Sequence, residues 1–200
     1  MNSTLCISLK TDPAQLAHLA ALQQAFSEVC NALAPIVQTT RCWNRVALHH
    51  LAYKQLRERF PTMGSQMVCN AIYSASRTSR LVYQHPQSPF NLARLGNKPL
   101  PLLRFSSTCP VYFDRHTLSV KDGQLSMYTL EGRIRFHLAL RDVDEAQFHE
   151  NKLREVVLSR TSPDCFALAF TFSAGQDSGM PSPDTANGEI PEYVMVEETT

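Results

Sequence analysis

Residues 4–9, TLCISL, form a strand pattern that has no neighbouring strand to pair with. The patterns that follow, up to residue 83, have the period of amphipathic helices. An isolated strand would leave its backbone donors and acceptors unpaired, so it must pair with a strand from a distant part of the chain. The next strand patterns begin at residue 102, where the apolar period shortens to that of strands. The chain is therefore predicted to be an α+β protein, with helices inserted after the first strand of a small antiparallel β-barrel.

The chain divides into four predicted segments. Residues 1–10 hold the first barrel strand, residues 11–100 hold the helical insertion, and residues 101–172 hold the rest of the barrel. Residues 173–200 are rich in Gly, Pro, Ser and acidic residues, a composition typical of segments that bury little apolar surface. They are predicted to form a flexible acidic tail, with one extended run at 193–196.

Three helices are predicted within the insertion. Asp12 and Pro13 suit the start of a first helix, and Pro35 is expected to end it. Two central helices lie between residues 41 and 83 and are joined at Pro61. Their apolar stripes comprise Leu48, Ala52, Leu56 and Phe60 in one helix, and Met67, Val68, Ala71, Ile72, Ala75 and Val82 in the other.

Turn residues predict how the later strands connect. Asp122 and Gly123 separate two alternating runs, which strongly indicates a β-hairpin. A last hairpin is predicted around residues 161–164. The polar residues 141–151 fit either a loop or a short helix.

The charge of the chain is unevenly distributed. Residues 41–104 contain ten Lys or Arg residues against one acid, Glu58, whereas residues 173–200 contain six acids and no base. The formal net charge of +1 therefore conceals a basic body. A basic surface with interleaved aromatic residues suits a phosphate backbone with stackable bases. An ordinary solvated helix face is the alternative, although such faces usually mix both signs.

The residues predicted to contact nucleic acid are basic, amide or aromatic. On one predicted strand, Arg133 and Arg135 share an outward face with Glu131 while Ile134 and Phe136 point inward, as in a small barrel that presents a nucleic-acid surface. An ordinary solvated strand is the alternative. Arg57 either contacts phosphate or has a structural role, pairing with Glu58 or packing on Tyr53. The predicted contact residues are Arg41, Trp43, Asn44, Arg45, Tyr53, Lys54, Arg57, Arg77, Arg80, Tyr83, Arg115, Arg133 and Arg135.

No catalytic residue, metal site or cofactor site is predicted. The cysteines and histidines lack zinc-site spacing, no Gly-rich phosphate loop occurs, and Asp114 and Asp122 are explained by turns. His49 and His50 are adjacent on a helix and point about 100° apart, so they cannot grip one metal ion together. No apolar run reaches the length of a membrane span, and the scattered cysteines without a signal peptide predict a cytoplasmic protein with reduced thiols.

Two stretches of the sequence resemble a known family. They are residues 48–77 and 111–138, with the motif residues Tyr53, Leu56, Arg57, Phe60, Gln66, Ala71, Ile72, Phe113, Asp114, Arg115, Leu130, Gly132 and Arg133. In order and spacing these resemble the N-terminal half of the TnpB family of transposon-encoded RNA-guided nucleases, and of the related type V CRISPR effectors. The resemblance implies an OB-like wedge barrel with a helical recognition domain after its first strand. It also implies binding of guide RNA, an RNA–DNA heteroduplex or PAM-side DNA.

The sequence departs from the family where the nuclease would begin. The RuvC-like half, with its three metal-binding acids and its zinc site, should start about where this chain ends. The chain is therefore expected not to be an enzyme by itself, and a separate RuvC-like nuclease subunit is its expected partner. The alternatives are a regulator or inhibitor that competes for the guide RNA or target DNA of a full-length relative, and a degraded transposase fragment.

Overall fold

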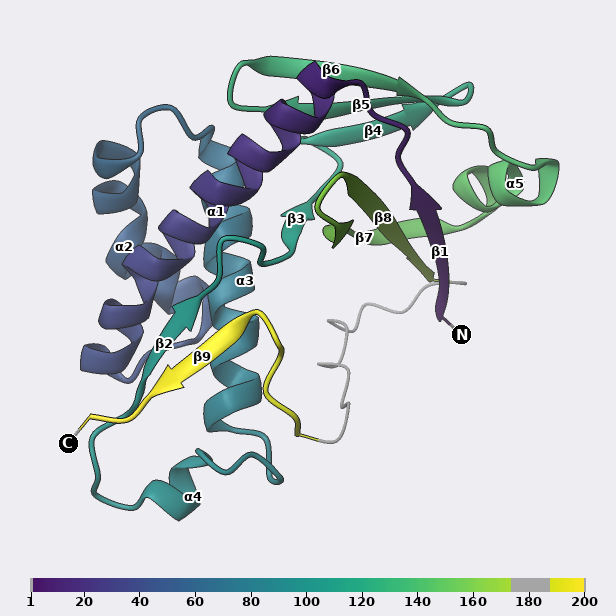
Figure 1. Ribbon diagram of the computed structural model, residues 1–200. Helices are drawn as coiled ribbons and strands as arrows, with labels where there is room; N and C mark the ends of the chain where they lie inside the picture. The colour runs from purple at the N-terminus through teal and green to yellow at the C-terminus, as the bar shows by residue number, and fades with distance from the viewer. Residues whose placement is uncertain (1, 174–187, 200) are drawn as a thin grey trace. The chain divides into compact units, whose positions relative to one another are not determined.

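The computed structural model describes residues 2–173 and 188–199 (Figure 1). They form two compact units, the first from residues 2–24 and 110–173, and the second from residues 25–109 and 188–199. The predicted α+β class is confirmed, since helices are combined with antiparallel sheets. Among the described residues no sheet closes into a barrel.

A four-stranded antiparallel sheet organises the first unit. Its first strand pairs with the penultimate strand of the chain, with Leu5 opposite Phe170. The prediction that the leading strand pairs with strands from beyond residue 101 is therefore confirmed. In the order of the sheet, the strands are β1 (Asn2–Ser8), β8 (Cys165–Ser173), β7 (Lys152–Ser162) and β3 (Val111–Phe113).

One face of this sheet forms the core of the first unit. Alternate residues of β8, from Phe166 to Phe172, are fully buried, as the period of a strand with one buried face requires. The polar stretch 141–151 contains the helix α5 (Asp142–Glu150), one of the two predicted alternatives. Its Phe148 makes edge contacts with Phe170 and Phe172 at ring-centroid distances of 5.1 and 5.0 Å.

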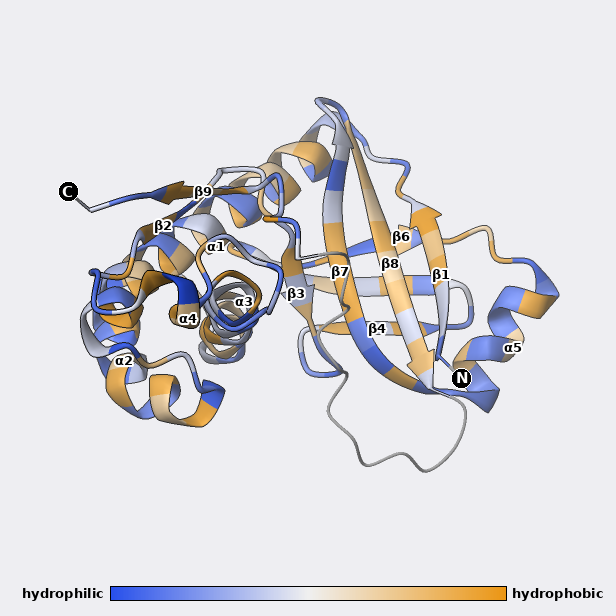
Figure 2. Cartoon of the chain, turned by 90° about the horizontal axis from the view of Figure 1, so that it is seen from below, coloured by the Kyte–Doolittle hydropathy of each residue, from blue (hydrophilic) through white to orange (hydrophobic). Residues whose placement is uncertain are grey.

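A second sheet of the first unit contains β4 (Leu118–Lys121), β5 (Gln124–Thr129) and β6 (Gly132–His137) in that order. The predicted hairpin joins β4 to β5, with Asp122 at φ 51° and Gly123 at φ 70°, the two left-handed residues that a type I′ turn needs. In Figure 1 this sheet lies above β7 and β8, and Figure 2 shows its strands crossing β7 and β8 steeply. The inward side chains are buried, among them those of Leu125, Met127 and Phe136.

The second unit is mainly helical. The two predicted central helices are α2 (Arg45–Arg59) and α3 (Ser65–Tyr83), and the chain turns between them at Pro61 as expected. A short helix, α4 (Leu92–Leu95), follows in the Pro-rich stretch. All six apolar residues of the predicted α3 stripe are buried, and in α2 so are Leu48, Ala52 and Leu56. Among the described helices, none is long and apolar enough to cross a membrane.

The long first helix, α1 (Pro13–Thr40), does not end at Pro35 as predicted. Proline removes one backbone donor and crowds the preceding turn, which usually ends a helix. Here the following turn is held by packing, because Val37 is buried and Gln38 Nε2 donates to the Leu100 carbonyl at 2.9 Å. The helix ends at Thr40, and the next residue, Arg41, takes the left-handed conformation at φ 53°.

The end of the chain differs in part from the prediction: the extended run expected at 193–196 is present as a strand at 194–197, but it is not part of a flexible tail. The strand β9 (Val194–Glu197) pairs with β2 (Leu102–Phe105), so this part of the expected flexible tail belongs to the second unit. Residues 174–187 of the expected tail lie outside the described residues. The strand β2 was expected in the barrel but belongs to the second unit, where Asn31 of α1 holds it. The Asn31 side chain accepts a hydrogen bond from the Phe105 amide at 2.7 Å and donates one to the Phe105 carbonyl at 2.9 Å. Isolated strand patterns do not reveal which partner they will find.

Candidate nucleic-acid interface

The outer face of the three-stranded sheet forms a basic surface of the first unit. The strand registers place Tyr128 opposite Arg133 and Ser126 opposite Arg135. They also place Lys121 and His137 on either side of Gln124. Neither Asp nor Glu occurs in the sequences of these three strands. We call this surface the basic sheet face; it comprises Lys121, Gln124, Ser126, Tyr128, Arg133, Arg135 and His137.

Arg133 is held in place on the basic sheet face. Its Nε donates to Ser126 Oγ at 2.9 Å, and its Nη2 donates to the Ser126 carbonyl at 3.0 Å. Its Nη1 donates to the His116 carbonyl at 3.3 Å. A guanidinium has five N–H donors, so these contacts leave one N–H on each terminal nitrogen. The charge of Arg133 is exposed and its position is fixed before any ligand arrives.

Arg135 and Arg115 extend the exposed charge. Arg135 lies on the edge strand β6, and its backbone carbonyl accepts a hydrogen bond from Gln15 Nε2 at 3.1 Å. The side chain remains exposed. Arg115 is exposed in the turn before β4, where its Nε lies 3.4 Å from His116 Nε2. The Asp114 carboxylate accepts from two backbone amides and the Thr117 hydroxyl of this turn, which confirms its predicted turn role.

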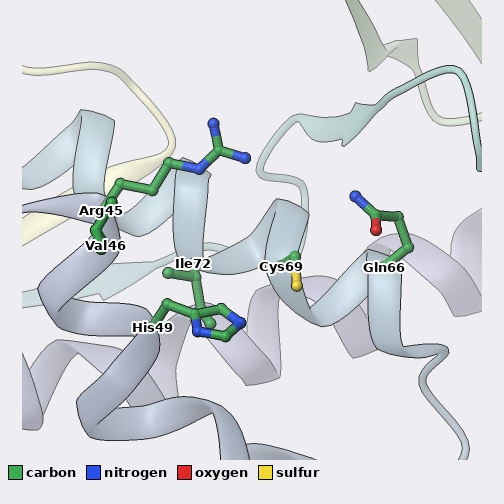
Figure 3. A pocket seen from close by; sticks show the side chains of 6 residues that line it. All are labelled: Arg45, Val46, His49, Gln66, Cys69 and Ile72. Atoms are coloured by element: carbon green, nitrogen blue, oxygen red, sulfur yellow. The ribbon is translucent and has the colours of Figure 1, made fainter.

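A groove between α2 and α3 forms a second candidate surface, within the second unit (Figure 3). Two stacked pairs border it. The His49 imidazole lies against Tyr53 at 4.6 Å with ring planes 17° apart. The Arg45 guanidinium lies 5.0 Å from the centre of the Tyr73 ring. We call it the interhelical groove; it has a volume of about 320 Å³ and is lined by Arg45, Val46, His49, Gln66, Cys69 and Ile72.

Trp43 and Tyr83 were predicted to contact nucleic acid, and the structure contradicts this. Trp43 is 7% exposed and Tyr83 is fully buried, with their ring centroids 5.2 Å apart. The Tyr83 hydroxyl donates to the Pro101 carbonyl at 2.6 Å, and burial raises the pKa of Tyr83. Both rings pack in the core, where no base can stack on them. An aromatic residue in a basic stretch looks the same in sequence whether it points inward or outward.

Asn44 was also predicted to contact nucleic acid, but its side chain is engaged as the N-cap of α2. Its Oδ1 accepts from the backbone amides of Val46 at 3.0 Å and Ala47 at 3.1 Å. These are two of the donors that a helix leaves unpaired at its start. Asn44 caps the helix that carries Arg45 and His49. It therefore supports the position of these two groove residues without lining the groove itself.

Replacing Asn44 by Ala is expected to lower the free energy of unfolding by about 1 kcal/mol, as the loss of a capping side chain usually does. Asn44→Asp keeps an acceptor at the same place and should restore most of the loss. Urea unfolding followed by far-UV circular dichroism measures both. Normal stability of Asn44→Ala combined with impaired nucleic-acid binding would assign the side chain to the ligand instead.

The remaining predicted residues of α2 divide into structural and exposed groups. Arg57 Nη1 donates to the Met63 carbonyl and so closes the turn between α2 and α3, a contact different from the predicted ones to Glu58 or phosphate. Lys54 is exposed on the solvent side of the helix. Arg41, after α1, is exposed and donates from Nη2 to the Lys98 carbonyl at 3.0 Å.

Arg77 and Arg80, on α3, are half-buried rather than fully exposed. Arg77 Nη1 lies 3.5 Å from the Tyr73 hydroxyl. Burial raises the pKa of Tyr193, and the nearby charge of Arg77 opposes that rise, so Arg77 also faces the segment that ends in β9. Of the two, Arg80 is the better placed for an external ligand, because its side chain makes no hydrogen bond or ion pair with the described residues.

Several residues of these surfaces were missed at the sequence level. Lys121, Tyr128 and His137 share a face with Arg133 and Arg135, and the two-residue period of the hairpin was sufficient to place them there. Tyr73 also lies in the basic stretch 41–104 but is not among the predicted contact residues. No spacing rule would have found its contact with Arg45, because the two residues lie on different helices.

The described residues contain no cluster of three or more His, Cys, Asp or Glu side chains that could hold a metal ion. A comparison of the sequence with protein-family models gave no match, and a comparison with curated proteins gave none either.

Proposed function

We propose that the chain binds nucleic acid without cutting it, as the wedge and recognition half of a TnpB-like RNA-guided nuclease does. The observation that carries the proposal is the basic sheet face, which combines cations with an aromatic ring and has no acid in its strands. Small antiparallel sheets of the OB type bind single strands in this way, with cations along the backbone and aromatic rings under the bases. The face of Tyr128 beside Arg133 suits one such stacked base.

The order of the elements supports a wedge-like role. A first strand, a helical stretch and the strands that complete the sheet follow each other as the family resemblance implies. In this proposal the first unit is an incomplete OB-like wedge, and the second unit is the recognition part. The ligand is a guide RNA, its heteroduplex with target DNA, or PAM-side DNA, recognised mainly through shape and phosphates. Cutting is assigned to a separate subunit with the RuvC-like fold.

The double substitution Lys121→Ala with Arg135→Ala tests the proposal. It is expected to lower affinity for a structured RNA at least about tenfold, because a charge-assisted hydrogen bond contributes roughly 1.5–3 kcal/mol. It should also reduce the slope of log affinity against log salt by about 1 for each phosphate that the variant no longer neutralises. Filter binding measures both, and the thermal midpoint should hardly move, since exposed surface substitutions have small effects on stability.

A matched control removes the same charge elsewhere. Lys10→Ala with Lys152→Ala also deletes two exposed cations, but neither residue lies on β4, β5 or β6. This control should retain nearly normal affinity. Equally weakened binding in both double variants would mean that only net charge matters, and an undiminished affinity of the Lys121→Ala, Arg135→Ala variant would remove the basic sheet face from the binding surface.

A further inference from the structure

The interhelical groove has the size of a site for one small ligand. Its volume of about 320 Å³ falls at the lower end of the range of roughly 300–1,000 Å³ found for small-molecule pockets. In Figure 3 the Arg45 guanidinium and the Gln66 amide lie in the upper part of the view, with Cys69 between them and Ile72 below Arg45. The space is open to solvent at the rim, where Val46 is 65% exposed.

The chemistry of the lining selects a flat, partly polar ligand that carries an anion. Ile72 and Cys69 supply apolar and polarisable contacts from α3. Gln66 adds a polar amide to the lining, and this residue already has a partner within the protein. Arg45 supplies the planar cation with several N–H donors that phosphate groups prefer.

The two stacked pairs hold the ligand-facing groups of the groove in place. Tyr53 stacks on the His49 imidazole, and the His50 ring meets the imidazole edge-on at a ring-centroid distance of 6.0 Å, which together fix the orientation of this groove-lining ring. Tyr73 supports the Arg45 guanidinium by a cation–π contact. Both groups therefore lose little conformational freedom when a ligand binds, which favours affinity.

The surroundings favour an anionic polymer over a peptide or an uncharged ligand. The exposed cations of α2 are opposed within the helix by Glu58 alone. Arg41 and Lys98 add charge beside its start, where Arg41 contacts the Lys98 carbonyl. A polyanion would be attracted by all of these cations, and its aromatic bases match the stacked rings.

We propose that the interhelical groove holds one unpaired nucleobase of a bound single strand, packed against the groove-lining imidazole of His49, with the adjoining phosphate on Arg45. The inference rests on the proposed nucleic-acid binding and adds to it a site for a base that is free of any duplex. The base is recognised mainly through its π-face, which predicts weak sequence preference.

Two probes of equal charge separate base binding from backbone binding. One is oligouridylate of about twelve nucleotides, within the range of known single-strand sites, and the other is an abasic ribose-phosphate strand of the same length. His49→Ala is expected to lower affinity for oligouridylate roughly 5- to 150-fold, as removal of one stacking partner does, and to leave affinity for the abasic strand unchanged. Arg45→Ala should lower affinity for both probes, because both contain the phosphate.

The matched control is His50→Ala. His50 is the same residue type on the same helix, it is exposed, and it does not line the groove; its ring meets the His49 ring edge-on at 6.0 Å, so this variant removes a neighbour of His49 but leaves the Tyr53 stack and the groove lining in place. This variant should bind both probes normally. Equal effects of His49→Ala and His50→Ala, or equally weakened binding of both probes by His49→Ala, would overturn the base site while leaving nucleic-acid binding intact. If the unmodified protein binds neither probe and no structured RNA, the proposed function fails as well.

Discussion

Raising the salt concentration from about 50 to about 200 mM is expected to weaken RNA binding by this protein roughly a thousandfold. Each phosphate that a cation neutralises releases condensed counterions, so log affinity falls with log salt by about 0.7 per phosphate on a single strand and about 0.9 on a duplex. Neutralisation of about six to eight phosphates produces the expected decrease. The basic sheet face and the exposed cations of α2 supply enough positive side chains for that number.

A filter-binding titration in potassium chloride measures the slope. The Lys121→Ala, Arg135→Ala variant serves as an internal check, because its slope should be shallower by about 2 if both side chains contact phosphate. A change in affinity of less than about tenfold over the same range would contradict the prediction. It would mean that the exposed cations form an ordinary solvated surface and that binding, if present, depends on uncharged contacts.

The kind and order of the elements followed from the sequence because they depend on local periodicity. The stripe of α3 and the Asp122–Gly123 turn are each encoded within a short stretch of chain, and both were predicted correctly. Pro35 was misleading because its cost to the helix is offset by packing around Val37, which is a tertiary effect. The pairing of β9 with β2 joins residues far apart in the chain, and no local pattern specifies such a partner.

The sequence predicted the charge of the candidate site but not which of its side chains are buried. Arg133 and Arg135 could be placed on an outer face from strand alternation, and they lie there. Trp43 and Asn44 precede α2 outside any periodic stripe, so no local pattern indicated that one is buried and the other caps the helix. Trp43 is buried against Tyr83, which lies far from it in the sequence, so the residues around Trp43 do not reveal its burial.

Replacing Trp43 by Ala is expected to lower the free energy of unfolding by about 3–5 kcal/mol, the usual cost of truncating a buried aromatic side chain. The indole is 7% exposed and packs against Tyr83, which is itself fully buried, so the core around it has little freedom to fill the space that the indole leaves. A decrease of this size is a large part of the roughly 5–15 kcal/mol that stabilises a typical domain. Trp43→Phe keeps a ring against Tyr83 and should recover most of it.

Tyr128→Ala, on the basic sheet face, is the variant with which Trp43→Ala should be compared. Here the expected effect is on binding, about 1–3 kcal/mol for one stacked base, with a small change in stability because the ring is only half-buried. Trp43 is the single tryptophan of the chain, so its variant must be followed by far-UV circular dichroism rather than by intrinsic tryptophan fluorescence. The opposite pattern, with stable Trp43→Ala that no longer binds RNA, would show that the indole faces the ligand as its place in a basic stretch first indicated. The two variants together therefore decide which aromatic residues of this chain hold the fold and which one is available to a base.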